Sequence, residues 1–137
     1  MTSPPRARGR WHLPSLWALR VTATLAAVVY LFQAVSAGQF LEGDYAFLRV
    51  HQLGTTVADV LMFVALVSTG CLKWVARGPL SPFLAVLGTI LVSQAQAAAG
   101  AARLIWLHVP LGVVLIGLVW AIAWAAWTAP NWTRVQR

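Results

Sequence analysis

Charged residues are scarce in this sequence, and the scarcity excludes an ordinary soluble domain. Asp, Glu, Lys and Arg make up 9% of the 137 residues, whereas 60% of the residues are hydrophobic. Soluble domains carry roughly 25% charged residues. Acidic residues are the rarest, with three against ten Lys and Arg. Because the basic residues border apolar runs and do not share one polar face, we expect a lipid bilayer and no nucleic acid as the partner.

Cysteine and the common catalytic motifs are also scarce or missing. Cys71 is the single cysteine, which excludes an internal disulfide and a cage of cysteine metal ligands. The sequence has no Gly-rich phosphate loop, no nucleophile elbow and no zinc-protease helix motif. We therefore expect that the chain by itself is not an enzyme.

Long apolar runs are what the sequence has in abundance. Each of four runs reaches the ~20 residues with which a helix crosses roughly 30 Å of hydrocarbon. Lipid offers no hydrogen-bond partner to the backbone, so each span is expected to be helical. The sequence thus predicts an all-α fold, a four-helix transmembrane bundle with up-down-up-down topology. The spans are expected at residues 17–38, 52–74, 80–101 and 104–128, in one domain over 17–128 between a disordered basic tail at 1–16 and a short basic tail at 129–137.

The basic residues predict an orientation in the membrane. Eight of them fall on one side of the expected spans, whereas Arg49 and Arg103 fall on the other. By the positive-inside rule both termini are expected in the cytoplasm, with the chain as a multi-pass protein of a bacterial plasma membrane. The alternative is that the first run is a cleaved signal peptide, since basic residues precede it and Ala34-Val-Ser-Ala37 resembles a cleavage site. Its length favours a retained span, because signal-peptide apolar regions are usually ~7–15 residues long.

Two histidines, His51 and His108, are the leading candidates for a functional site. Each lies near the start of a span that runs from the outer to the inner side, and their expected depths differ by only ~5 Å. In an up-down bundle the second and fourth helices are diagonal neighbours that can face each other across the core. Ionisable residues inside a membrane are functional candidates. We therefore predict a site near the outer leaflet.

Two imidazoles at one depth suit a cofactor that needs only two protein ligands, and haem with two axial histidines is such a cofactor. Gly54 lies on the helix face of the first histidine and Gly112 follows the second by one turn, so both are expected to leave room for a flat macrocycle. Arg49 and Arg103 are expected to pair with its propionates. We thus predict haem b, in electron transfer or haem handling. Histidines that only hydrogen-bond to lipid or to a carbonyl, another metal, and proton transfer are the alternatives.

Asp59 is the one acid within the expected spans. It lies ~12 Å deeper than His51 and is rotated by ~80° from it around the helix. Gln94 comes to a similar depth from the third span. Because an unpaired carboxylate in lipid is costly, we expect a hydrogen bond to Gln94, Ser93 or Thr56. A proton relay through Asp59 and Gln94 is the alternative.

A weak internal repeat divides the chain into two hairpins. Gln33-Ala-Val-Ser-Ala-Gly38 is similar to Gln94-Ala-Gln-Ala-Ala-Ala-Gly100, and each segment is followed one loop later by a helix that opens with a histidine. Two hairpins in the same orientation would be related by a pseudo-two-fold axis along the membrane normal.

The motifs His51-Gln-Leu-Gly54 and Leu107-His108 resemble those of one half of a heme A synthase, and also those of small four-span membrane proteins of actinobacteria. The resemblance covers roughly residues 17–128 and implies a four-helix bundle with two axial histidines. Leu48 stands where the synthases have an acid tied to catalysis, and Gln52 stands where Arg is common. Haem binding is therefore implied, whereas oxidative conversion of haem is not. A homodimer would restore the two bundles of that family, and a membrane redox partner is the other expected contact.

Two functions without haem are the alternatives. A cofactor-free accessory or scaffold subunit of a membrane complex would hold partner helices through its Ala and Gly faces. A small proton-coupled exporter is disfavoured, because such proteins carry an essential acid in the first helix and the first run here has none.

Overall fold

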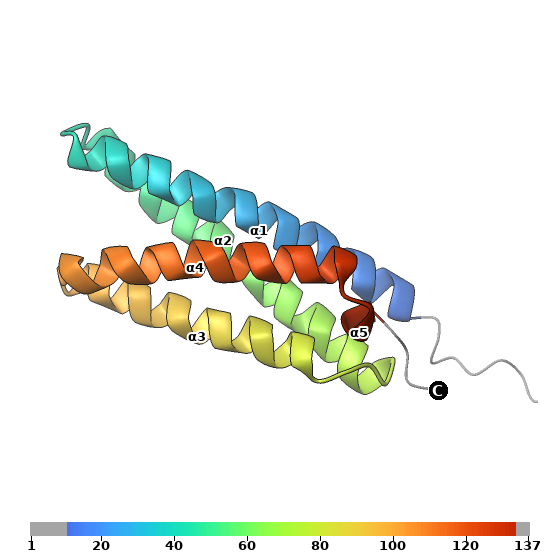
Figure 1. Cartoon of the computed structure of the whole chain (residues 1–137). Helices are drawn as coiled ribbons and strands as arrows, with labels where there is room; N and C mark the ends of the chain where they lie inside the picture. Colours follow the sequence, from blue (N-terminus) through green and yellow to red (C-terminus); the bar gives the residue numbers. More distant parts are fainter. Residues whose placement is uncertain (1–10, 134–137) are drawn as a thin grey trace, which may run out of the picture.

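A computed structural model describes residues 11–133, and every regular element in that part of the chain is helical (Figure 1). The elements are α1 (His12–Leu41), α2 (Ala46–Gly70), the π-helical turn η2 (Cys71–Val75) that continues α2, α3 (Ser81–Ala101), α4 (Ile105–Thr128) and the short α5 (Pro130–Thr133). Successive long helices run in opposite directions along the bundle (Figure 1). The all-α fold class is confirmed.

Four helices are long and apolar enough to cross a membrane: α1 with 30 residues, α2 and η2 together with 30, α3 with 21 and α4 with 24. At 1.5 Å per residue even the shortest covers roughly 30 Å. Large apolar side chains stay exposed along all four, among them Leu31, Phe63, Leu91 and Val113. Such surfaces suit lipid contact, and the chain is thus a four-helix bundle of the multi-pass membrane type.

Two helices begin earlier than the sequence predicted. α1 begins at His12, so the expected tail over residues 1–16 overlaps it by five residues, while residues 1–10 lie outside the described part. Pro14 does not prevent this early start, because the first turn of a helix needs no amide donor there. α2 begins at Ala46 and includes Arg49, which was expected to precede the span. Arginine is a good helix former, so it does not end the helix.

The C-terminal boundary agrees with the predicted span. α4 ends at Thr128, and Pro130 opens the separate short helix α5. Proline suits the first position of a helix, where its missing amide donor is not needed. The expected tail over residues 129–137 thus includes a short helix, and residues 134–137 lie outside the described part.

Packing is tightest at the end of the bundle where the chain enters and leaves it. α1 packs along α2 and against α4, and α3 packs along α4. Leu16 and Leu19 of α1 are buried there, and Ala23, Ala26 and Ala27, buried near the middle of α1, let the neighbouring backbones approach closely. Towards the α1–α2 and α3–α4 loops the two hairpins move apart (Figure 1). This divergence opens the space described below.

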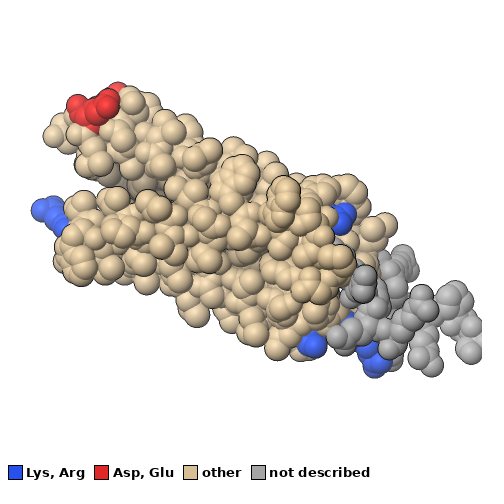
Figure 2. Space-filling view, viewed as in Figure 1, with Lys and Arg blue, Asp and Glu red and all other residues tan. Residues whose placement is uncertain are grey.

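Charges concentrate at the ends of the molecule. In Figure 2 acidic side chains gather at the α1–α2 loop end, basic side chains lie near the helix ends, and the face between them carries neither. Such a distribution suits a helical bundle surrounded by lipid.

Candidate functional site

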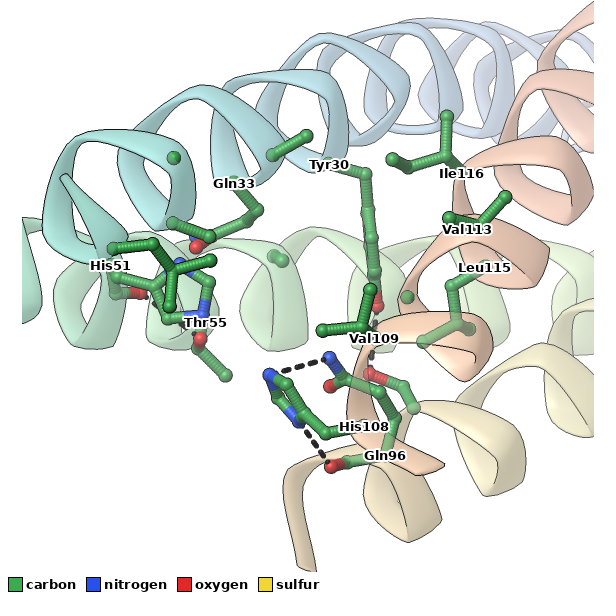
Figure 3. A pocket seen from close by; sticks show the side chains of 17 residues that line it. Tyr30, Gln33, His51, Thr55, Gln96, His108, Val109, Val113, Leu115 and Ile116 are labelled. Carbon is green, nitrogen blue, oxygen red and sulfur yellow. Dashed lines mark hydrogen bonds between the residues drawn. The ribbon is translucent and has the colours of Figure 1, made fainter. Parts of the chain in front are cut away.

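His51 in the second turn of α2 and His108 in the first turn of α4 lie opposite each other between the diverging hairpins (Figure 3). Their ring centroids are 6.3 Å apart and the ring planes make an angle of 62°. Both side chains are partly buried. The two imidazoles therefore share one site.

Hydrogen bonds assign the tautomer of His51. The Ser36 hydroxyl, which is fully buried, donates to the Gln33 backbone carbonyl over 3.0 Å. Its proton is thus engaged, so the Ser36 oxygen accepts from Nδ1 of His51 over 3.1 Å. With the proton on Nδ1, the neutral ring carries its lone pair on Nε2.

His108 has the same assigned tautomer. Its Nδ1 lies 2.8 Å from the Gln96 backbone carbonyl, which can only accept, so Nδ1 carries the proton. The Nε2 lone pair accepts from the Gln96 side-chain amide over 3.2 Å. A Cβ at Gly100 would lie 2.6 Å from Nδ1 of this ring. Gly100 therefore provides the space in which His108 makes its bond to the carbonyl.

The Gln33 side chain is a buried amide without a partner. Neither its Nε2 nor its Oε1 has a hydrogen-bond partner among the described residues, although both atoms are buried. The amide lies against Gly54, so a side chain at that position would require the Gln33 amide to move. The macrocycle space expected beside Gly54 is thus occupied by Gln33. Gly112 lies beside the Gln96 amide, at an ordinary van der Waals distance of 3.5 Å for an added Cβ.

Two adjoining hollows flank the histidines. An inner one of about 250 Å³ reaches Tyr30 and Ser93, whose hydroxyls are 2.8 Å apart. An outer one of about 390 Å³ extends towards Leu48 and Ile105 near the loops. His51, His108, Thr55 and Gln96 line both. Apolar walls with a few polar groups directed inward are typical of small-molecule sites.

The other predicted site residues take different places. Gly112 lines the inner hollow. Arg49 and Arg103 are exposed near the loops and do not line either hollow. Gln94 donates a hydrogen bond to Asp59 over 3.3 Å, and Gln94 is one of the partners predicted for this acid. The pair also lies outside both hollows.

Sequence reasoning missed the residues that hold the histidines. Ser36, Gln96 and Gly100 all lie within the two repeated segments, so polar and small residues in those segments were an available signal. The structure also suggests a different register for the repeat. Gln33 and Gln96, not Gln33 and Gln94, are the equivalent amides, because each lies beside a helix glycine and lines the inner hollow together with the histidine of its own hairpin.

The four long apolar helices are compatible with a small integral membrane protein, and the paired imidazoles form a polar site inside the bundle. Within residues 11–133 no group of three or more His, Cys, Asp or Glu side chains could hold a metal ion. Comparison with known protein families, curated proteins and solved structures finds no match to this chain. The resemblance to heme A synthases therefore rests on the two short histidine motifs.

Proposed function

We propose that the chain binds haem b between His51 and His108 as a small membrane protein of electron transfer or haem handling. The observation that carries the proposal is the pair of Nδ1-protonated imidazoles, 6.3 Å apart, whose Nε2 atoms hold the lone pairs. Metal-bound histidines nearly always donate their other ring N–H to a carbonyl, hydroxyl or carboxylate. Both histidines are held in this way.

The spacing of the rings would allow both histidines to hold one metal ion. Bonds between a metal ion and an imidazole nitrogen are about 2 Å long, so two imidazoles that bound one ion through Nε2 could have ring centres roughly 6 Å apart. The measured separation of 6.3 Å agrees with this value. A haem would supply one-electron chemistry whose potential is set by axial ligands and nearby hydrogen bonds.

The chain's own residues would bind and orient such a group. The Ser36 hydroxyl and the Gln96 carbonyl fix the two rings. The Gln96 amide, which bonds to Nε2 of His108, has to turn away before that nitrogen can take a metal. Gly112 and the apolar walls of the hollows offer a dry surface, and Arg49 and Arg103 near the loops remain our proposed partners for propionates.

The proposed orientation puts this site near the outer leaflet of a bacterial plasma membrane, with both termini in the cytoplasm. It is supported by the basic residues around the α2–α3 connection, Lys73 and Arg77.

The test is an absorption spectrum of the purified chain with haem supplied. We expect a Soret band that shifts on reduction with dithionite and the spectrum of a six-coordinate low-spin haem. His51→Ala and His108→Ala should each weaken haem binding at least tenfold, because one axial bond is lost. His12→Ala is the matched control, since His12 begins α1 at the opposite end of the bundle. A Soret band that is absent, or that both site variants leave unchanged, contradicts the proposal.

A cofactor-free scaffold subunit is the second candidate, and one observation favours it. Both ring nitrogens of His108 already have protein partners, as a purely structural histidine requires. In that case the double variant His51→Ala/His108→Ala would leave the assembly and activity of partner subunits unchanged, whereas a haem protein would lose its redox function.

A further inference from the structure

Asp59 and Gln94 form a polar pair outside the bundle core, between α2 and α3. The Gln94 amide donates to Oδ1 of Asp59 over 3.3 Å; the glutamine is exposed and the acid is partly buried. One helical turn away, Phe63 on α2 and Leu91 on α3 are 64% and 63% exposed. A carboxyl group and an amide thus lie on a surface that otherwise suits lipid.

This pair is unlike the other polar groups of the spans. Ser68 and Thr89 donate to carbonyls one turn earlier in their own helices, so they need no outside partner. Among the described residues, the bond between Gln94 and Asp59 is the one hydrogen bond that either side chain makes. The second carboxyl oxygen, the amide oxygen and one amide N–H therefore remain for other partners.

The depth of Asp59 makes this incomplete pairing costly. Asp59 is the fourteenth residue of the 30-residue span Ala46–Val75, close to its middle. A charged side chain at the centre of a membrane helix is costly, and such residues almost always face protein or a water-filled cavity. We therefore expect another helix, and not lipid, against this face.

We propose that this face is the interface of a homodimer, in which Asp59 and Gln94 of one copy bond to Gln94 and Asp59 of a second copy. A two-fold axis brings identical patches together, so the patch must be self-complementary. The second carboxyl oxygen of Asp59 can accept a hydrogen bond and the remaining N–H of the Gln94 amide can donate one, so the patch meets that condition. Interhelical hydrogen bonds of this kind and close approach at small residues stabilise membrane helix pairs, and the exposed Ala98 lies one turn from Gln94.

The test measures self-association in lipid vesicles by energy transfer between two labelled pools of the full chain, diluted in excess lipid. We expect a dimer for the wild type and at least a tenfold weaker dimer for Asp59→Leu. Asp59→Asn keeps a donor and an acceptor and should retain most of the association. If Asp59 only faces lipid, Asp59→Leu leaves association unchanged, and that result overturns the proposal.

A second pair of variants tests the position of the interface. Ala98→Phe adds bulk to the proposed face, and Ala121→Phe adds the same bulk to the exposed side of α4. Only the first should break the dimer, while helix content stays unchanged for both. If the wild type is monomeric in pure lipid, the homodimer proposal is wrong. The face would then be covered by a helix of another protein. The proposal is independent of haem, since the pair lies outside both hollows.

Discussion

At the scale of single residues, the two glutamine amides near the histidines are in opposite situations. Gln96 bonds to Nε2 of His108, whereas the buried Gln33 amide has no hydrogen-bond partner among the described residues. A buried polar group without a partner costs about 1–3 kcal/mol, and a formed hydrogen bond contributes about 0.5–1.5 kcal/mol. Gln33 is therefore a polar group suited to a ligand that the chain itself does not provide.

Replacing each glutamine by leucine should have opposite effects on the ligand-free protein. Gln33→Leu removes an unsatisfied amide and should raise the free energy of unfolding by about 1–3 kcal/mol. Gln96→Leu removes the bond to His108 and should lower it by about 0.5–1.5 kcal/mol. SDS titration in detergent micelles measures both. A loss of stability in Gln33→Leu equal to that in Gln96→Leu would show that the Gln33 amide has a partner in the protein.

At the scale of elements, α3 positions His108 through the missing side chain of Gly100. Gly88 of the same helix is a suitable control position for substitutions. A Cβ at Gly100 would lie 2.6 Å from Nδ1 of His108, whereas a Cβ at Gly88 meets nothing within 4 Å. The close approach of α4 to α3 at the site thus depends on the missing side chain at Gly100.

Gly100→Ala should displace the His108 ring and break its bond to the Gln96 carbonyl. We expect a loss of about 1–3 kcal/mol in stability from the added methyl group, together with weaker haem binding. Gly88→Ala should instead raise stability by about 0.5–1 kcal/mol, because alanine is the better helix former. Thermal unfolding and haem titration check the pair. Equal haem affinity in both variants would mean that the position of the ring does not control binding.

A contact between α1 and α4 holds the two hairpins together at the end of the bundle opposite the site. Nε of Arg20 donates to the Ala126 carbonyl over 2.9 Å, and its guanidinium lies 4.9 Å from the centre of the Trp127 ring. The indole of Trp127 in turn donates to Thr24 over 3.1 Å. These bonds join the last turns of α4 to α1 at the end of the bundle away from the hollows.

At the scale of the whole molecule, the orientation in the membrane is open to a direct chemical test. In a Cys71→Ala background, we expect Glu42→Cys in the α1–α2 loop to react with a membrane-impermeant maleimide in intact cells. Ser81→Cys at the start of α3 should react only after permeabilisation. Both native side chains are exposed, so they are a matched pair. The reverse labelling pattern would put the site at the cytoplasmic face.

The sequence alone determined the number of spans, their helical form and the exclusion of an ordinary soluble domain, because lipid thickness and the backbone's need for hydrogen bonds act on each segment by itself. It also drew attention to His51 and His108, since ionisable residues are rare in such runs. Helix starts were less predictable, as Arg49 continues α2 and does not precede it.

Only the tertiary structure decided how the histidines are held and what lies beside them. The bond from His51 to Ser36, the contact between Gln33 and Gly54 and the bond from His108 to Gln96 all join different helices. Such contacts depend on the rotation and approach of packed helices, which no local property of one segment contains. The sequence located Asp59 in depth and about 80° around the helix from His51, but only the packing of α2 against α3 decided that Gln94 is its hydrogen-bond partner.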